Sequence, residues 1–254
     1  MNQASHLNIY ATDHINSKTV CTAFAAGTGG VIAPPAPLLP GDVFMYGCLR
    51  GLETTLRQAQ AENRTWFYAD NGYLKPGHYG GYYRITRNAY QIDGRGESDG
   101  KRATKLGITL KPWRRDGRHV LFCPISPTWG AINGVDPVKF SADTLQLLRR
   151  LTDRPLKVRA KNSGQALASD LKNAWCLVTY SSNAAVEALI AGIPVFCRGT
   201  CAASAMSSSL EFIDTPAMQE RENWLGVLAD NQWTLEEMRK GTAWEMLQQK
   251  AGSS

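Results

Sequence analysis

The sequence predicts an α/β protein built from two Rossmann-like halves. Strand-like and helix-like segments alternate along both ends of the 254-residue chain, and residues 93–118, first polar and Gly-rich and then basic, separate the two series. Such alternation is typical of parallel strands joined by crossover helices. The composition agrees, because 43% hydrophobic and 20% charged residues provide for one large core or two small ones and argue against disorder and a coiled coil.

The N-terminal series is typical of a β-α-β-α-β unit. Short apolar runs bounded by turn residues predict its strands, and apolar residues at helical spacing predict its helices. The expected elements are a strand at 7–12, a helix from Thr19 to Ala26 capped by Ser17 and ended by Gly27, a strand at 42–47, a helix at 49–62 and a strand at 65–69. Residues 30–40 hold four prolines, so we expect a loop or an extended connection there.

A functional loop is expected at residues 70–88, which are rich in Gly, Tyr and cationic side chains and show no clean period. Long irregular segments on a compact scaffold commonly carry function. Basic residues between Lys101 and Arg118 are compatible with an anion-binding surface, as is the net charge of +6. An anionic partner is therefore expected.

The C-terminal series alternates in the same way. Its expected elements are strands at 119–123, 156–159, 175–179 and 193–197, and helices at 141–151, 164–172, 183–191, 223–228 and 234–247. Thr234 and Glu237 have the spacing of a capping box at the start of the last helix. We therefore expect an N-terminal domain at residues 1–115, a C-terminal domain at residues 116–254 that includes the last helices, and a ligand cleft between the two.

The six cysteines are scattered singly, mostly inside apolar runs, at Cys21, Cys48, Cys123, Cys176, Cys197 and Cys201. This spacing suits neither a zinc site nor a disulfide framework, so we expect reduced thiols that act as small hydrophobes and no metal. The first residues lack a basic region followed by an apolar one, and no apolar run reaches the roughly 20 residues of a membrane span. A cytoplasmic protein without a span is the expectation.

Candidate ligand-binding residues follow three strands of the C-terminal half, since open α/β sheets bind ligands beyond the carboxyl ends of their strands. The rule selects Ser126, Thr128 and Trp129, then Arg159 and Lys161, and then Ser181, Ser182 and Asn183. The last three begin a helix, whose amide groups and dipole suit a phosphate, and Glu187 is placed to reach a ribose. Equally, Ser182 or Asn183 is a plain helix cap and Glu187 a solvated acid.

Residues 179–196, Thr-Tyr-Ser-Ser-Asn-Ala-Ala-Val-Glu-Ala-Leu-Ile-Ala-Gly-Ile-Pro-Val-Phe, resemble the donor-binding signature of GT-B glycosyltransferases. The form is closest to capsule-type sugar transferases and related small bacteriophage transferases. The resemblance implies that the Ser-rich turn holds the phosphate of a sugar nucleotide and that the Glu contacts or approaches its ribose. Residues 66–73 and 83–88 resemble phage-encoded transferases more faintly.

Residues 156–161 resemble the basic element that precedes this signature, which implies that Arg159 and Lys161 contact the diphosphate. Ala160 and Lys161 stand where capsule transferases usually show His-Pro, so the donor's identity stays open. GT-B enzymes hold the leaving diphosphate with amides and cations, and the resemblance therefore implies metal-independent transfer. No cofactor is expected besides a nucleotide-sugar co-substrate, with UDP as the expected nucleotide.

An inverting transferase also needs a base that deprotonates the acceptor hydroxyl. Asp70 follows a predicted strand, where such a carboxylate would project; alternatively, it starts an Asp-Asn-Gly turn by bonding its own backbone. His78 is the rival base, and Asp13 and His14 are further candidates.

The loop at 70–88 also carries candidate acceptor-binding residues, in which aromatic rings for stacking alternate with cations for phosphates: Tyr73, Tyr79, Tyr82, Arg84 and Arg87. The alternative is that Tyr83 and Ile85 alternate inward in a strand and that the arginines are ordinary surface groups.

The function implied by the resemblance is that of a metal-independent, inverting, nucleotide-sugar-dependent glycosyltransferase. A hydroxymethylated pyrimidine in phage DNA, flipped out of the duplex, is the expected acceptor, given the basic chain and the Tyr/Arg-rich loop; the location would then be the host cytoplasm. The alternatives are a surface polysaccharide or other glycan as acceptor, and a non-catalytic module that binds nucleotide or nucleic acid. The oligomeric state is left open.

Overall fold

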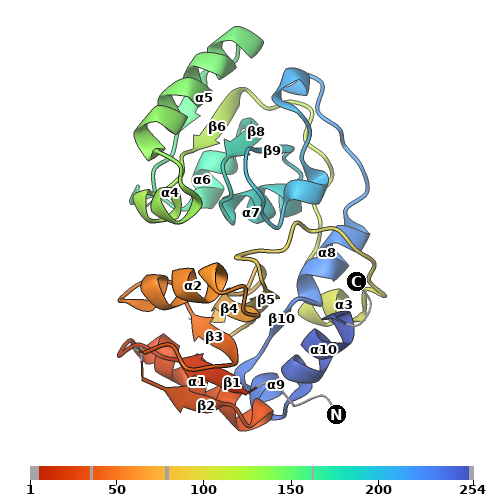
Figure 1. The fold of residues 1–254 in the computed structure, drawn as a ribbon. Coiled ribbons are helices and arrows are strands. Elements are labelled where there is room, and N and C mark those ends of the chain that lie inside the picture. The colour runs from red at the N-terminus through yellow and green to blue at the C-terminus, as the bar shows by residue number, and fades with distance from the viewer. Residues whose placement is uncertain (1–5, 35–36, 78–79, 162, 252–254) are drawn as a thin grey trace. The chain divides into compact units, whose positions relative to one another are not determined.

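The computed structural model describes residues 6–34, 37–77, 80–161 and 163–251, and it has the predicted α/β class (Figure 1). The chain forms two compact units. Unit 1 contains residues 1–90 and 230–254, and unit 2 contains residues 91–229. Unit 1 is therefore discontinuous, because the end of the chain returns to it.

The described residues of unit 1 form a six-stranded sheet with the order β10-β5-β4-β3-β1-β2. Its elements are β1 (Leu7–Tyr10), α1 (Ile15–Thr28), β2 (Val31–Ala33), β3 (Asp42–Tyr46), α2 (Leu52–Ala61), β4 (Trp66–Asn71), β5 (Tyr83–Arg87), β10 (Gln232–Trp233), α9 (Leu235–Arg239) and α10 (Thr242–Ala251). The strands β1 to β4 pair in parallel, whereas β5 and β10 are antiparallel to their neighbours. The predicted β-α-β-α-β unit is thus present, with strands added at both edges.

The core of unit 1 contains residues from both the N-terminal and the C-terminal parts of the chain. The rings of Phe24 on α1 and Phe44 on β3 stack with their centroids 3.9 Å apart. Trp233, Met238 and Leu247, from β10, α9 and α10, are buried in the same cluster. On the other side of the sheet, α2 packs on β3 and β4 (Figure 1).

The unit boundaries differ from the predicted ones. The prediction placed the boundary between residues 115 and 116 and assigned the last helices to the second domain, whereas the units change at 90/91 and 229/230. The physical reason is that the apolar faces of α9 and α10 are buried against α1, and that β10 extends the sheet of unit 1 by pairing with β5. An amphipathic pattern shows that a helix needs a partner surface but not which sheet supplies it.

Several local predictions in unit 1 were wrong. The helix expected at 234–247 is two helices, α9 and α10, with Gly241 at a φ of 81° between them. Helix α1 begins after His14, whose Nδ1 accepts a hydrogen bond from the Asn16 amide at 3.3 Å, and it runs past Gly27 to Thr28. Ser17, the predicted cap, lies inside the helix and accepts a hydrogen bond from Thr12 N at 3.0 Å. Strand β2 fits the extended connection that was one of the two expectations for residues 30–40. Strand β5 replaces part of the loop expected at 70–88, because pairing with β4 supplies the hydrogen bonds that this segment needs.

Unit 2 contains a four-stranded parallel sheet with the order β7-β6-β8-β9. Its elements are α3 (Lys101–Leu106), β6 (His119–Cys123), α4 (Pro127–Asn133), α5 (Pro137–Leu151), β7 (Leu156–Val158), α6 (Leu167–Leu171), β8 (Ala174–Thr179), α7 (Ala184–Ile190), β9 (Val195–Cys197), η2 (Ser204–Met206), η3 (Leu210–Phe212) and α8 (Glu222–Ala229). Val120, Phe122 and Val178 are fully buried in its core. All four predicted strands and the helices between them are present.

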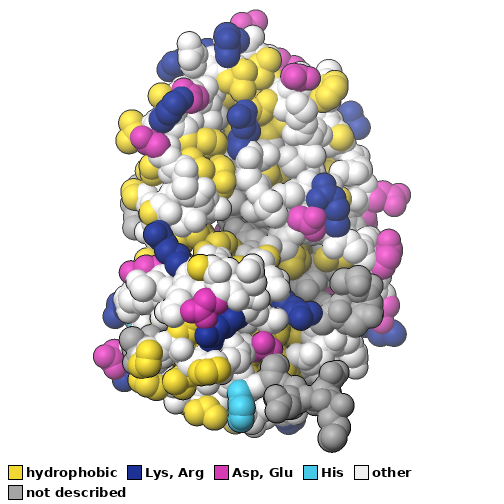
Figure 2. All heavy atoms as spheres, viewed as in Figure 1, with side chains coloured by type: hydrophobic (Ala, Val, Ile, Leu, Met, Phe, Trp, Pro, Cys, Tyr) yellow, Lys and Arg dark blue, Asp and Glu magenta, His cyan; other side chains and the backbone are white. Residues whose placement is uncertain are grey.

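The basic stretch between residues 101 and 118 is part of unit 2, and several of its side chains serve the fold. The Arg102 guanidinium donates to Ala229 O at 3.1 Å, and that of Arg114 donates to Ala174 O at 3.3 Å. On the face drawn in Figure 2, Lys and Arg side chains are interspersed with Asp and Glu. None of the described helices is long and apolar enough to cross a membrane.

Candidate functional site

The sheet of unit 2 reverses its strand order between β6 and β8. The chain leaves β6 toward β7 on one side, and it leaves β8 toward β9 on the other. The connections therefore diverge at the carboxyl ends of these two neighbouring strands, which is where open α/β sheets bind ligands. Across this position, the Thr179 hydroxyl donates to Cys123 O at 2.8 Å.

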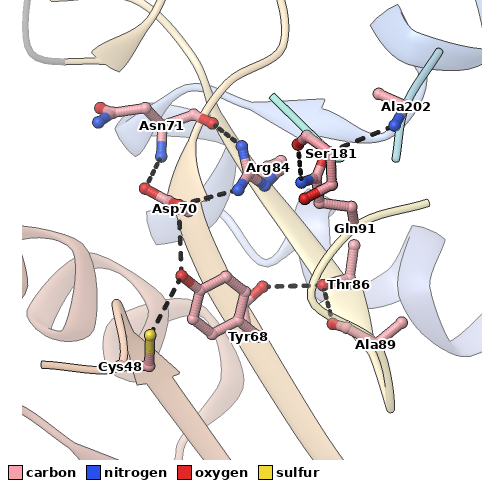
Figure 3. A network of polar contacts seen from close by, with 10 residues as sticks. All are labelled: Cys48, Tyr68, Asp70, Asn71, Arg84, Thr86, Ala89, Gln91, Ser181 and Ala202. Carbon is pink, nitrogen blue, oxygen red and sulfur yellow. Dashed lines mark hydrogen bonds and ion pairs between the residues drawn. The ribbon is translucent and has the colours of Figure 1, made fainter. Parts of the chain in front are cut away.

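The turn after β8 carries three predicted donor-binding residues. Ser182 Oγ accepts a hydrogen bond from Ala184 N at 3.2 Å, so this side chain acts as a cap of α7. Ser181 is buried, and its carbonyl oxygen accepts from the Gln91 side-chain amide at 2.9 Å (Figure 3). Asn183 makes no capping hydrogen bond, and its Oδ1 is buried without a partner among the described residues. Asn183 Oδ1 is thus a hydrogen-bond acceptor without a partner among the described residues, in the turn that follows β8.

The segment after β6 carries the other predicted residues of this edge. Ser126 caps α4, since its Oγ accepts from Trp129 N at 3.3 Å. Its hydroxyl proton is not used in that bond. Thr128, in the first turn of α4, is exposed.

Arg159 follows β7 directly and is held in place by backbone and side-chain bonds. Its backbone N donates to Phe122 O at 2.8 Å, and its guanidinium donates to Gln165 O at 2.8 Å and forms an ion pair with Asp170. Lys161, the second predicted diphosphate contact, is exposed.

Asp170 is a charged residue of this region that the sequence reasoning missed. Its carboxylate, 3% exposed on α6, contacts Lys157 Nζ at 2.7 Å through one oxygen and the Arg159 guanidinium through the other. The hydrogen bond from Lys157 lowers the pKa of Asp170, burial acts in the opposite direction, and the bond from Arg159 adds to the lowering. No local motif signals such a contact, because 11 residues separate Arg159 from Asp170.

Glu187 lies one turn into α7, and its side chain is exposed. Partial desolvation raises its pKa, and the charge of Arg159 acts in the opposite direction. Arg159 and Glu187 follow different strands, β7 and β8, of the same sheet. The structure thus brings residues from three predicted clusters to one edge of the sheet of unit 2.

In unit 1, Asp70 occupies the carboxyl end of β4 and is the centre of a polar network (Figure 3). Its Oδ2 accepts from an Arg84 guanidinium nitrogen at 2.8 Å and from the Tyr68 hydroxyl at 3.3 Å, and its Oδ1 accepts from Asn71 N at 2.7 Å. Arg84 also donates to Asn71 O at 3.0 Å and lies over the Tyr73 ring, 5.2 Å from its centroid. The Asp70 carboxylate is thereby fixed from three directions.

The ion pair combines a buried cation with an accessible anion. The Arg84 side chain is only 5% exposed, whereas the Asp70 side chain is 29% exposed. Burial acts to lower the pKa of Arg84, but the charges of Asp70 and of the neighbouring tyrosines together outweigh it and the pKa is raised. Burial also raises the pKa of the Tyr68 hydroxyl, and the Asp70 charge adds to that effect. Asp70 is therefore an oriented carboxylate that a ligand hydroxyl can reach.

The predicted acceptor-binding residues are not gathered on one surface. Tyr73 and Arg84 are buried, Tyr82 is half-buried and Arg87 is exposed. Tyr83 and Ile85 lie in the core of unit 1, as the strand alternative expected. His78 and Tyr79 lie outside the described residues.

The two remaining candidates for the base have structural partners. Asp13 is exposed and pairs with Lys18 Nζ at 3.0 Å, and His14 caps α1. Within the part of the chain that the structure describes, no three His, Cys, Asp or Glu side chains are grouped to hold a metal ion. The metal-independent reaction stays a prediction.

Comparison with known proteins gives similarity at the level of structure. No protein-family model matches the chain, and no curated protein matches it either. Among solved structures, a KpsC β-Kdo 2,4-transferase of Thermosulfurimonas dismutans is 13% identical, with 88% of this chain and 90% of that chain covered and a TM-score of 0.54. A KpsC β-Kdo 2,7-transferase of the same organism is 11% identical, with 96% and 99% covered and a TM-score of 0.55. The likeness confirms the predicted GT-B-like fold class with its two Rossmann-like units.

Proposed function

We propose that the chain is a nucleotide-sugar-dependent glycosyltransferase that transfers its sugar to a glycan. The observation that carries the proposal is that Ser126 and the Ser181–Asn183 turn follow β6 and β8, the two strands of the strand-order reversal, and that Arg159 follows the adjacent strand β7. Ligands of open α/β sheets bind at this position. The fold shared with two Kdo transferases supports the same class of reaction.

On this proposal, unit 2 binds the donor. The amide groups and side chains of the Ser181–Asn183 turn contact a phosphate, and the unused Oδ1 of Asn183 accepts a hydrogen bond from the nucleotide or the sugar. Arg159 keeps N–H groups beyond those directed to Asp170 and Gln165, and these bind the diphosphate together with Lys161. Glu187 accepts from a ribose hydroxyl, and Ser126 and Thr128 complete the site.

Unit 1 supplies the base in this proposal. Asp70 accepts the proton of the acceptor hydroxyl, while Arg84 and Tyr68 hold the carboxylate in one orientation. Tyr82, which precedes β5, and Arg87, the exposed last residue of β5, contact the acceptor. His78 remains the rival base, and the cleft between the two domains remains a prediction.

A glycan is the better supported acceptor. The DNA prediction depended on a Tyr/Arg-rich surface, but Tyr73 and Arg84 are buried. The charges on the face drawn in Figure 2 are mixed and do not form a basic stripe. Both solved structures described above are named Kdo transferases. The donor nucleotide, expected to be UDP, and the absence of a cofactor stay predictions.

The donor site is tested by thermal shift against UDP, CMP, GDP, ADP and TDP. A nucleotide present at about 100 times its Kd stabilises the folded state by about 2.7 kcal/mol, so one of the five is expected to raise Tm by several degrees. Arg159→Met should shrink this shift, whereas Arg150→Met, an exposed arginine at the end of α5, should preserve it. If none of the five shifts Tm at millimolar concentration, the donor site is wrongly assigned.

The base is tested with sugars of the nucleotide that binds. Asp70→Asn should lower turnover onto a glycan acceptor by about 10²- to 10⁴-fold and leave the nucleotide-induced Tm shift in place. Asp13→Asn, which alters an exposed ion pair, is the matched control and should retain activity. Nucleotide binding without turnover in wild type would favour the binding module, and salt-sensitive binding of hydroxymethylated DNA would favour the nucleic-acid acceptor.

A further inference from the structure

Two of the six cysteines are neighbours in the fold. Cys197 ends β9, Cys201 lies in the loop that follows, and their Sγ atoms are 3.3 Å apart. All six cysteines are free thiols, as expected from the sequence. Cys197 and Cys201 nevertheless differ from thiols that only pack as small hydrophobes, because two sulfurs at this distance can react with each other.

The surroundings of the pair differ for the two sulfurs. The contact with the Cys197 thiol lowers the pKa of Cys201 against the effect of burial, and the backbone N–H groups of Ala203 and Ser204 and the Ser204 hydroxyl contribute further. The same interaction raises the pKa of Cys197. The Ser204 hydroxyl also donates to Cys201 Sγ at 3.8 Å, so Cys201 is the sulfur of the pair that is better placed to react as a thiolate.

We propose that Cys197 and Cys201 form a covalent modification site, a dithiol that closes to a disulfide when it meets a hydroperoxide. The Cys201 thiolate attacks one peroxide oxygen, which breaks the O–O bond, forms a sulfenic acid and releases hydroxide. The Cys197 sulfur, after losing its proton to that hydroxide, then attacks Cys201 Sγ and displaces the sulfenic hydroxyl as hydroxide, which is protonated by solvent. The two thiols lose two electrons and two protons, and hydrogen peroxide becomes two molecules of water.

The geometry favours this oxidant and this product. Cys201 is only 1% exposed, so a two-oxygen oxidant can reach it more readily than a bulky disulfide such as oxidised glutathione. A disulfide bond is about 2.05 Å long, so the sulfurs need to approach by little more than about 1 Å. Residues 198–200 between them have no helical or strand structure that this movement would break.

Formation of the disulfide would move the loop after β9, which contains Cys201 and is bonded to three other segments of unit 2. Ala202 N donates to Gln91 Oε1 at 3.4 Å, and Ala202 O accepts from Trp224 Nε1 at 2.7 Å. The same Gln91 side chain donates to Ser181 O at 2.9 Å, and Figure 3 shows it between Ser181 and Ala202. Moving Cys201 displaces Ala202 and so alters the Gln91 bridge. The proposal does not depend on the proposed function.

The experiment oxidises the reduced full-length chain with hydrogen peroxide, alkylates the remaining thiols after denaturation and maps the peptides by mass spectrometry. We expect loss of the two alkylatable thiols at 197 and 201, a linked peptide pair and full recovery with dithiothreitol. Cys21, Cys48, Cys123 and Cys176 are buried like Cys201, but burial raises the pKa of their thiols, so they act as internal controls that stay alkylatable. Hydrogen exchange should change at residues 180–183 and 198–203 and not in β1.

Two variants identify the attacking sulfur. A 1,3-diketone probe should trap a sulfenic acid at Cys201 in Cys197→Ser, and none should be trapped at Cys197 in Cys201→Ser. Methionine oxidation without a linked pair, disulfides among the control cysteines, or equal trapping in both variants would overturn the proposal. Peptide mapping of the wild-type chain tests the formation of the disulfide even where a variant fails to fold.

Discussion

At the scale of single residues, the paired charges decide which side chains are fixed. The Asp170 carboxylate accepts hydrogen bonds from two cations, Lys157 in strand β7 and Arg159 directly after that strand. Asp70 and Arg84 form a second pair, in which the cation is buried and the anion is open to solvent. The first contact orients Arg159 and the second orients Asp70, and the proposed function gives each of these two residues a role.

Asp170→Asn should lower the free energy of unfolding by about 1.5–3 kcal/mol at pH 7, the range for hydrogen bonds to charged groups. The folded-state pKa of Asp170 lies below its ordinary value, so its stabilisation is complete above the unfolded-state pKa, about 3.9, and is lost as pH falls through the folded value. The difference between wild type and Asp170→Asn should therefore shrink below about pH 4. Urea unfolding at a series of pH values measures it.

Asp143→Asn is the matched control. This carboxylate is 59% exposed and bonds Lys139 one turn away on α5 at 2.6 Å. Exposed pairs of this kind contribute about 0.3–0.5 kcal/mol. An Asp170→Asn effect of the same size at pH 3 as at pH 7 would show that packing, and not charge, explains the loss.

At the scale of elements, hydrogen bonds at the ends of helices and strands explain where the elements begin. Helix α9 starts with the capping box that the sequence predicted: Thr234 Oγ1 accepts from Glu237 N at 3.2 Å, and Glu237 Oε2 accepts from Thr234 N at 2.8 Å. Strand β10, only two residues long, is anchored by Gln232, whose side-chain amide bonds both Leu74 N and Leu74 O. A short element can be stable when its side chains satisfy distant backbone groups.

Thr234→Ala should destabilise unit 1 by about 1 kcal/mol, because it leaves the amide groups of the first turn of α9 without their cap. Thr234→Ser keeps the hydroxyl and should retain most of the stability, which separates the cap from the loss of a methyl group. Urea unfolding of the three proteins makes the comparison. Equal losses in both variants would mean that the hydroxyl does not contribute.

At the scale of the whole molecule, the chain builds unit 1, then unit 2, and then completes unit 1. The returning segment contributes Trp233, Met238 and Leu247 to the core around Phe24. Truncating a buried tryptophan to alanine costs about 3–5 kcal/mol, which is a large part of the stability of an ordinary domain. Unit 1 therefore depends on residues 230–251.

A chain that ends at Ala229 should keep unit 2 folded and lose the cooperative structure of unit 1. Its thermal unfolding should show the transition of unit 2 alone, and amides of β1, β3 and β4 should exchange rapidly with solvent. Residues 91–229 expressed alone provide the control and should give the same transition. Full protection of β1, β3 and β4 in the shortened chain would contradict the dependence on the C-terminal segment.

Local sequence patterns were enough to predict the α/β class and most of the strands and helices of both units. Apolar periodicity, caps and turn residues act over a few positions, so β1, β3, β4 and β6 to β9 could be predicted within a few residues. It also placed polar residues after the strands of unit 2, because the end of a parallel strand is a local feature of the chain. The capping box of α9 belongs to the same class of local signals.

Contacts between residues that are distant in the sequence could not be predicted and are seen only in the folded chain. No local pattern predicts that α9 and α10 return to unit 1 or that β5 and β10 pair in antiparallel fashion. The same holds for the ion pairs of Arg84 and Arg159 and for the neighbouring thiols of Cys197 and Cys201. Each depends on contact between elements, or on the path of a loop. The physical reason is that an apolar face or a buried charge requires a partner, and only the packed chain specifies which one it receives.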